Sequence, residues 1–411
     1  MTDSRSPQVA AERAAAVVIL AGVSAALHIA KLPPAIAALQ AGLGISLLQA
    51  GFLLSLVQAA GMTAGVAFGV LADGLGLKRS MLIGLTLLAT ASALGPLCNA
   101  VPMLMALRAL EGFGFLLVVL PAPGLVRRLV PPQRLSRVLG FWGTYMPFGT
   151  ALALLVGPLW IGAFGWHAWW WLLAALSLAM AAWLARAVPD LPAPTQTGAA
   201  DTGWWQRLRQ TLSAPGPWLV AMTFAVYAGQ WLAVIGFLPT IYLQAGLSGG
   251  LTGLLTALAA AVNMAGNVAS GRLQQAGVAP TRLLRIGFVT MALTAAAAFA
   301  EVGGSGLPAP LRFGAVLVFS LVGGLIPATL FSLAVRLAPS EQTLSSTVGW
   351  MQQWSALGQF AGPPLVAWLA GRAGGWQWTW VATGICALFG LGLAGGIGRL
   401  LQRQSRMADN R

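Results

Sequence analysis

The sequence predicts an all-α membrane protein built from twelve transmembrane helices. Of its 411 residues, 58% are hydrophobic and 8% are charged, against about 25% charged residues in an ordinary soluble domain. So few charges cannot cover the polar surface that a globule of this size needs, which excludes a water-soluble enzyme. The 17 tryptophans and 51 glycines are typical of aromatic anchors at membrane interfaces and of close helix packing in lipid.

Apolar stretches recur along the chain at lengths that suit a bilayer. A span needs about 20 apolar residues as helix, and helix is expected because backbone groups in lipid must bond within their own segment. The expected spans are Ala14–Leu39, Leu47–Ala72, Ser80–Asn99, Val101–Val126, Val138–Ala163, Ala168–Ala187, Pro217–Leu243, Leu251–Leu273, Leu283–Val302, Leu311–Val335, Thr347–Ala370 and Trp378–Gly398.

These spans form two sets of six. We expect a tail over residues 1–13, a six-helix bundle over 14–188, a linker over 189–215, a second bundle over 216–398 and a tail over 399–411. Val66–Leu71 is echoed by Val268–Leu273, and Arg137–Trp142 by Ser346–Met351. Such a repeat predicts two pseudo-symmetric halves about an axis along the membrane normal. In the linker, Trp204–Arg209 fits a short helix at the lipid surface.

The basic residues set the orientation. The net charge is +14, and nearly all lysines and arginines lie on the side of the two termini. The exceptions are Arg312 and Arg372 on the other side, and Lys31 and Arg108 inside spans. The positive-inside rule then predicts that both termini are cytoplasmic. Nucleic-acid binding is not needed to explain the charge.

The turn after the second span carries a family motif. A glycine allows close helix approach, an acidic residue ends the span, and glycines and a basic pair form a tight cytoplasmic turn. We expect this gating loop to consist of Gly69, Asp73, Gly76, Lys78 and Arg79. The turn closely resembles the signature loop of the major facilitator superfamily, although Gly74 stands where that family usually has a basic residue. Arg108–Gly114 is similar to the second motif of the same family.

Within the superfamily the chain most resembles the cyanate permease and nitroimidazole transporter group. The likeness lies in Lys31–Pro34 of the first span and Gly229–Thr240 of the seventh. The resemblance implies the major facilitator fold, alternating access, and a central cavity lined by spans one, four, seven and ten. It also implies a multi-pass protein of the bacterial inner (plasma) membrane.

Four ionisable residues lie deep in the first and fourth spans. His28 and Lys31 are three residues apart, as are Arg108 and Glu111, so each pair shares a helix face. At ~1.5 Å per residue, both cations lie about 10–12 Å below the outer boundary, and His28 and Glu111 lie about 15–16 Å below it. Matching depths on two helices predict a shared cavity, since a charge at this depth is normally paired or functional.

The leading hypothesis for these residues is an anion site. Lys31 and Arg108 would hold a small negative group, Arg108 with two parallel hydrogen bonds, and Glu111 would be the proton-coupling carboxylate. The alternative is that Arg108 and Glu111 neutralise each other and only stabilise the fold. Lys31 has no evident acidic partner in the sequence, which favours the first reading. His28 would either shuttle protons or bond to a neighbouring helix.

The seventh span offers a second group of polar residues. Tyr227, Gln230 and Trp231 share a face and would close the other side of the site with hydrogen bonds and an aromatic wall. For Trp231, ordinary helix packing is the simpler explanation. Asn263 and Asn267 of the eighth span fit interhelical polar bonds without any substrate.

The sequence offers no chemistry for catalysis or for cofactors. Gly390–Gly395 matches a dinucleotide-binding pattern, but no strand precedes it, so we reject that site. Two histidines and two distant cysteines predict no metal site, and a phosphate-binding loop with lysine is absent.

The predicted function is therefore symport of a small organic or inorganic anion with protons, in a lipid bilayer. The alternatives are a proton-driven exporter of drugs or metabolites and a membrane sensor or scaffold that binds without transport.

Overall fold

The computed structural model of this protein comprises two compact units. The first holds Met1–Ser46, Leu56–Gln196 and Leu238–Ala257, and the second holds Leu47–Ser55, Thr197–Phe237 and Leu258–Arg411. The residues described are 5–63, 76–98, 100–131, 134, 138, 141–142, 144–190, 204–302, 305–340 and 343–409. The domain boundaries expected from the sequence stay a prediction.

The first unit is built from long helices around one apolar core. Its elements are α1 (Arg5–Ala30), the 3₁₀ turn η1 (Pro33–Ala35), α2 (Ile36–Leu43), η2 (Leu56–Gln58), α5 (Leu77–Leu94), η3 (Gly95–Leu97), α6 (Val101–Val119), α7 (Ala122–Leu129) and α9 (Tyr145–Ala187). Helix α1 packs against α9, and α5 packs against both α6 and α9. Buried residues such as Val18, Leu85, Leu88 and Val118 form the core where these helices meet.

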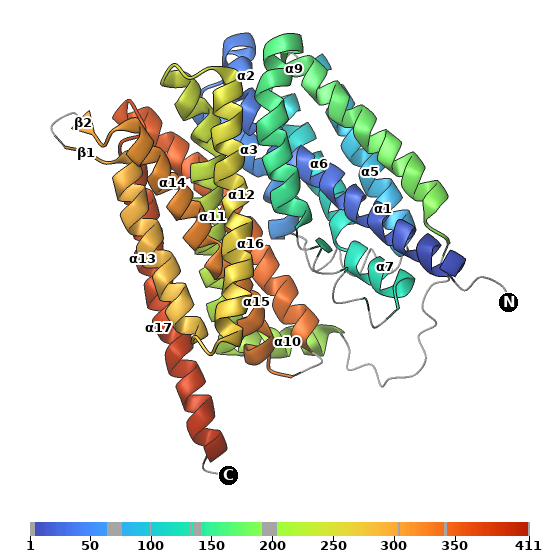
Figure 1. Cartoon of the computed structure of the whole chain (residues 1–411), viewed down its shortest axis with the longest axis vertical. Helices are drawn as coiled ribbons and strands as arrows, with labels where there is room; N and C mark the ends of the chain where they lie inside the picture. The colour runs from blue at the N-terminus through green and yellow to red at the C-terminus, as the bar shows by residue number, and fades with distance from the viewer. Residues whose placement is uncertain are drawn as a thin grey trace. The chain divides into compact units, whose positions relative to one another are not determined.

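Proline and glycine interrupt the spans of this unit. The first expected span breaks after Ala30 and resumes at Pro33, because Pro33 and Pro34 cannot donate the hydrogen bonds that would continue the helix. The two spans expected over residues 138–187 meet within α9, which consists of two helices joined at a kink where Gly165 has φ 80°. Only glycine adopts this conformation without strain, and Figure 1 shows the chain turning back within α9.

The second unit contains the remaining helices and a small hairpin. Its elements are α3 (Leu47–Ser55), α10 (Trp204–Ser213), most of α11 (Pro215–Gln244) and α12 (Gly249–Gln275), α13 (Pro280–Phe299), β1 (Glu301–Val302), β2 (Ser305–Gly306), α14 (Ala309–Gly323), α15 (Leu325–Leu337), α16 (Leu344–Ala373) and α17 (Thr379–Asp409). Helix α13 packs against α14 and α17, and α3 packs against α16. The linker segment at Trp204 is helical, as expected.

Several expected boundaries differ from the structure. The ninth span ends at Phe299, and Glu301 and Val302 instead pair with Gly306 and Ser305 in an antiparallel hairpin. Helix α17 continues to Asp409 rather than ending at Gly398. Local hydropathy does not detect a two-residue strand, nor does it detect a helix that continues beyond its apolar part.

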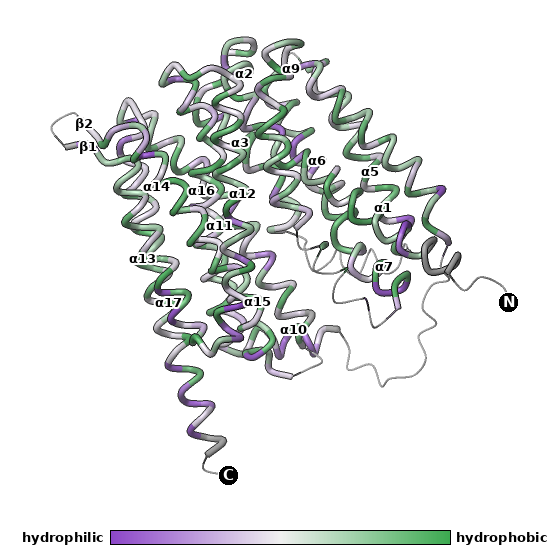
Figure 2. Tube along the Cα trace, viewed as in Figure 1, coloured by the Kyte–Doolittle hydropathy of each residue, from purple (hydrophilic) through white to green (hydrophobic). Residues whose placement is uncertain are grey.

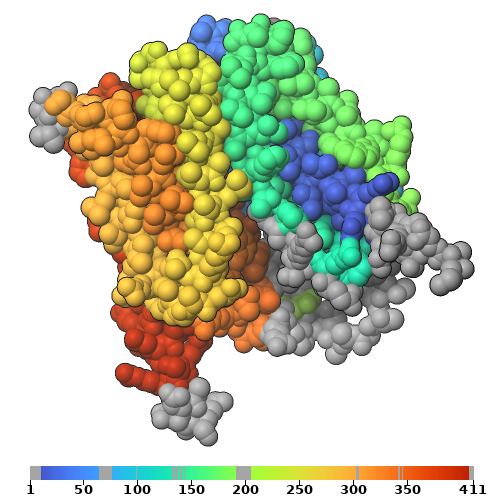
Figure 3. All heavy atoms as spheres, viewed as in Figure 1, coloured from blue at the N-terminus to red at the C-terminus, as the bar shows by residue number. Residues whose placement is uncertain are grey.

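Length and hydropathy identify membrane-crossing helices. Within the described ranges, nine helices are long and apolar enough to cross a membrane, and Leu47–Thr63 is a shorter apolar helix. Figure 2 shows hydrophobic residues along the spans and hydrophilic ones in α7, in α10 and at the end of α17. Large apolar side chains are exposed on α12 and α13, for example Leu254 and Leu293, and atoms of both helices are visible in Figure 3. An apolar outer surface of this kind suits contact with lipid.

Glycines allow close contact between helices in the second unit. A Cβ atom on Gly358 of α16 would meet the carbonyl oxygen of Ala225 in α11, and one on Gly362 would meet that of Gly229. These two glycines therefore allow α16 to approach α11 closely. A Cβ on Gly392 of α17 would have no atom within 4 Å, so this glycine is not needed for such a contact.

Candidate functional site

The first part of the site is the broken end of α1. The last carbonyls of a helix have no partner inside it, and here side chains from other helices bond to the broken segment. Arg108 of α6 donates from Nη1 to the carbonyl oxygen of His28 at 2.8 Å. Trp169 of α9 donates from Nε1 to the carbonyl oxygen of Lys31 at 3.1 Å. The negative end of the α1 dipole therefore faces the two cations that the sequence placed at this depth.

A charged cluster consisting of Lys31, Arg108 and Glu111 lies beside this helix end. Lys31 Nζ pairs with Oε1 of Glu111, and Arg108 Nη1 pairs with Oε2 of the same carboxylate. The exposed fractions of Lys31, Arg108 and Glu111 are 0%, 1% and 1%. Two cations share one anion, so the cluster carries one net positive charge while His28 is neutral.

Neutral side chains complete the surroundings of Lys31. Its Nζ donates to Ser92 Oγ of α5 at 2.9 Å and lies 4.6 Å from the ring centroid of Trp170. Ser92 in turn donates to the carbonyl oxygen of Trp170 at 2.9 Å. The lysine is therefore held by a carboxylate, a hydroxyl and an aromatic face, which together offset the cost of burying its charge.

His28 borders the cluster on the α9 side. It is fully buried, and its Nε2 is 2.7 Å from Ser177 Oγ of α9. Its Nδ1 lies 3.7 Å from Glu111 Oε1 and has no hydrogen-bond partner among the described residues. The ring thus stands between a carboxylate and a hydroxyl group.

The structure brings together the four ionisable residues that the sequence singled out. The expectation that Lys31 lacks an acidic partner is wrong, because Glu111 pairs with Lys31 as well as with Arg108. Spacing along one helix cannot reveal a contact between α6 and a lysine beyond the end of α1. Ser92, Ser177 and Trp170 were also missed; the only sequence signal for the serines was a hydroxyl inside an apolar span.

The residues of α11 lie in the second unit. Tyr227 accepts a hydrogen bond from Asn263 Nδ2 at 3.0 Å, and Trp231 donates to Ser320 Oγ at 3.1 Å. These bonds to α12 and α14 hold helices together, as expected for Trp231 and Asn263. Gln230 is 3% exposed, and neither atom of its amide has a hydrogen-bond partner within the described part of the chain. The role of the three α11 residues in substrate binding stays a prediction.

The expected gating loop is described only in part. Gly69 and Asp73 lie outside the described residues. Gly76 precedes α5 with φ 85°, Lys78 Nζ lies 2.9 Å from Asp190 Oδ1, and Arg79 is exposed. Gating by this loop stays a prediction.

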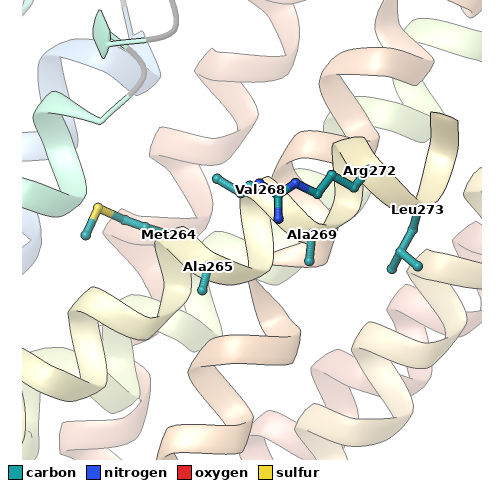
Figure 4. A pocket seen from close by; sticks show the side chains of 6 residues that line it. All are labelled: Met264, Ala265, Val268, Ala269, Arg272 and Leu273. Carbon is teal, nitrogen blue, oxygen red and sulfur yellow. The ribbon is translucent and has the colours of Figure 1, made fainter. Parts of the chain in front are cut away.

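A separate hollow lies along α12 in the second unit. Figure 4 shows the six side chains that line it, which are Met264, Ala265, Val268, Ala269, Arg272 and Leu273. All come from one helix, and five of the six are apolar. This hollow therefore lacks the converging polar groups that a specific small-molecule site needs.

Comparison with known proteins identifies the family. The family model described as Major Facilitator Superfamily matches residues 16–363. The chain belongs to the Major Facilitator Superfamily. This is a family of transporters, which confirms the predictions of an all-α, multi-pass integral membrane protein that is not an enzyme.

Curated superfamily members match parts of the chain. A putative niacin/nicotinamide transporter of Bacillus subtilis is 29% identical over 46% of this chain and 48% of its own length. A tetracenomycin C resistance and export protein of Streptomyces glaucescens is 30% identical over 25% and 19%. The cyanate transport protein CynX of Escherichia coli is 23% identical over 42% and 43%. The chain thus spans about half the length of these relatives, or less, and the narrower cyanate permease group is not confirmed.

Solved structures of the superfamily share the fold. A bacterial homolog of the human lysosomal transporter Spinster has a TM-score of 0.79 at 14% identity, covering 94% of this chain and 96% of that one. The nucleoside transporter NupG has a TM-score of 0.75 at 13% identity, covering 93% and 98%. At such identities the likeness shows the fold alone.

Proposed function

We propose that this protein is a secondary transporter that moves a small monovalent anion together with a proton by alternating access. The observation that carries the proposal is the charged cluster, in which Lys31 and Arg108 come from different segments and share the carboxylate of Glu111. We also propose that it works in the bacterial inner membrane with both termini cytoplasmic, on the basis of the positive-inside distribution.

Competition for the two cations would couple the anion to the proton. While Glu111 is ionised, its carboxylate occupies Lys31 and Arg108, so an entering anion meets a site that is already filled. Protonation of Glu111 removes that charge and makes both cations available to the anion. Proton and anion therefore enter together.

The charge balance supports a monovalent substrate. The empty cluster carries one net positive charge, and adding one proton and one monovalent anion leaves that charge unchanged. The electrostatic cost of holding the site inside the membrane is then the same for the empty and the loaded protein. A neutral substrate or a divalent anion, each carried with one proton, would change the net charge of the cluster.

The named relatives support this substrate class in part. Cyanate is a monovalent anion at neutral pH, and its transporter is similar to part of this chain. The putative niacin/nicotinamide transporter is named for one carboxylate, niacin, and one neutral amide, nicotinamide. The similarity to a tetracenomycin C export protein supports the exporter as the second candidate. Efflux of lipophilic compounds would distinguish an exporter from a transporter that takes up anions.

Uptake into proteoliposomes tests the proposal. The probes are radiolabelled cyanate and nicotinate, with and without an imposed inward proton gradient. We expect the gradient to drive accumulation of at least one probe, and Lys31→Met to weaken its binding by about tenfold or more, because a charged hydrogen-bonding partner is lost. Arg312→Met is the matched control, since it removes one positive charge from an exposed pair with Glu301.

The outcomes separate the candidate functions. The proposal is contradicted if accumulation does not depend on the proton gradient, or if Lys31→Met leaves accumulation unchanged. Efflux of lipophilic compounds without anion uptake would establish the exporter. Saturable binding without flux would establish a sensor or scaffold.

A further inference from the structure

A short file of hydrogen-bonding groups leads away from Glu111 on the α9 side. His28 Nδ1 lies 3.7 Å from Glu111 Oε1, and His28 Nε2 lies 2.7 Å from Ser177 Oγ. Ser177 Oγ lies 3.3 Å from Ser24 Oγ, with either hydroxyl as donor. Ser24 and His28 are one turn apart on α1, and Ser177 bridges them from α9. The anion site of the preceding proposal uses Lys31, Arg108 and Glu111, so it leaves this file without a role.

The two ring nitrogens of His28 face different partners. Nε2 already bonds to Ser177, whereas Nδ1 has no hydrogen-bond partner within the described part of the chain and lies next to the carboxylate. A fully buried polar atom without a partner costs free energy, so its presence calls for an explanation such as a functional role. An imidazole placed in this way can receive a proton on one nitrogen and release another from the second.

The charges around His28 suit transfer rather than storage of a proton. Glu111 and Arg108 face it from α6, and Lys31 lies one turn beyond it on its own segment; α5 and α9 contribute the hydroxyls of Ser92 and Ser177. Two cations near the ring disfavour a long-lived imidazolium, and the carboxylate of Glu111 is the acceptor that lies beside Nδ1. A proton that reaches His28 therefore moves on to Glu111.

We propose that Ser24, Ser177 and His28 form the route by which the coupling proton reaches and leaves Glu111, which rests on the proposed function. Ser24 is the outer end of the file, because it is 5% exposed whereas His28 and Ser177 are 0% exposed. His28 starts with its proton on Nδ1. A hydronium ion gives a proton to Ser24, Ser24 passes its own proton to Ser177, and Ser177 passes its own proton to Nε2 of His28. His28 releases the proton on Nδ1 to Glu111 Oε1, which leaves the ring protonated on Nε2, and the reverse transfer during release restores the first tautomer. Release runs the same steps in reverse.

Separating proton-driven accumulation from substrate exchange tests this route. Exchange of labelled for unlabelled anion at equal pH needs no net proton movement, whereas accumulation driven by the gradient does. We expect Ser177→Ala and His28→Gln to lower gradient-driven accumulation of nicotinate or cyanate by about tenfold or more, as for loss of a proton-transfer group. Exchange should stay within about twofold of the unaltered protein.

Ser80→Ala is the matched control. Ser80 is also a fully buried serine, but it donates to the carbonyl oxygen of Leu117 and takes no part in the file. We expect this variant to accumulate substrate normally. Proton entry measured with a pH-sensitive dye inside the vesicles should follow accumulation in every variant.

Each outcome has one meaning. Normal accumulation in Ser177→Ala and His28→Gln overturns the route while the proposed function stands. Loss of exchange together with accumulation in both variants also overturns it, because these residues would then be needed to carry the substrate. If the unaltered protein shows no proton-driven anion uptake, the proposed function fails and the route fails with it.

Discussion

A double-mutant cycle on Lys31 and Glu111 gives the most demanding test of the charged cluster. Lys31→Met keeps the Arg108–Glu111 pair complete and replaces the ammonium group by a thioether of similar length. Glu111→Gln instead removes the one carboxylate that both buried cations share. The two single variants therefore disturb the same contact in unequal ways.

The structure sets the expected magnitudes. Removing one partner of a buried ion pair costs about 3–5 kcal/mol, so Glu111→Gln should lower the free energy of unfolding by at least this amount. Lys31→Met should lower the free energy of unfolding by about 1–2 kcal/mol, because the variant loses the hydrogen bond to Ser92 and the contact with the ring of Trp170. In the double variant one uncompensated cation remains instead of two. The double variant should therefore lose less unfolding free energy than the two single variants added together, by about 1–3 kcal/mol.

Equilibrium unfolding in mixed detergent micelles, followed by tryptophan fluorescence, measures the four free energies. The reference cycle uses Arg312 and Glu301, an exposed pair 3.4 Å apart, for which we expect a coupling below about 1 kcal/mol. A coupling between Lys31 and Glu111 no larger than this reference would refute the shared-carboxylate arrangement.

Two further predictions concern packing and hydrogen bonding in the second unit. Gly266→Val should lower the free energy of unfolding by about 1–3 kcal/mol or more, because the new Cβ would overlap a backbone carbonyl oxygen of α14. Gly392→Val should change the unfolding midpoint little, because no atom lies within 4 Å of the position of its Cβ. Asn263→Leu should lower the free energy of unfolding by about 1–3 kcal/mol, because the amide of Asn263 donates to a hydroxyl of α11 and a carbonyl of α14. Asn267→Leu should lower it less, since among the residues that the structure describes the amide of Asn267 bonds only to Asn263. Unfolding midpoints in detergent check both pairs, and equal losses within either pair would contradict the reasoning.

Much of the fold follows from the sequence because membrane helices are local. Composition, apolar length and proline positions predict where a helix crosses and where it breaks, as at Pro33 after α1. The prediction is weaker where an interruption depends on context. Helix α16 runs through Pro363 and Pro364, although proline lacks the backbone donor that continues a helix, and the hairpin at Glu301 has too few residues to show a pattern.

The candidate site, like the fold, could be predicted from the sequence only in part. The sequence by itself determined that four ionisable residues lie at matching depths in two spans, since depth is a count of residues along a helix. Only the tertiary structure decided that Lys31 and Arg108 converge on one carboxylate and that His28 bonds to Ser177 of α9. The physical reason is that a side-chain contact depends on how α1, α6 and α9 pack against one another. That packing is set by many contacts distant in sequence, whereas helix formation and depth are set by neighbouring residues.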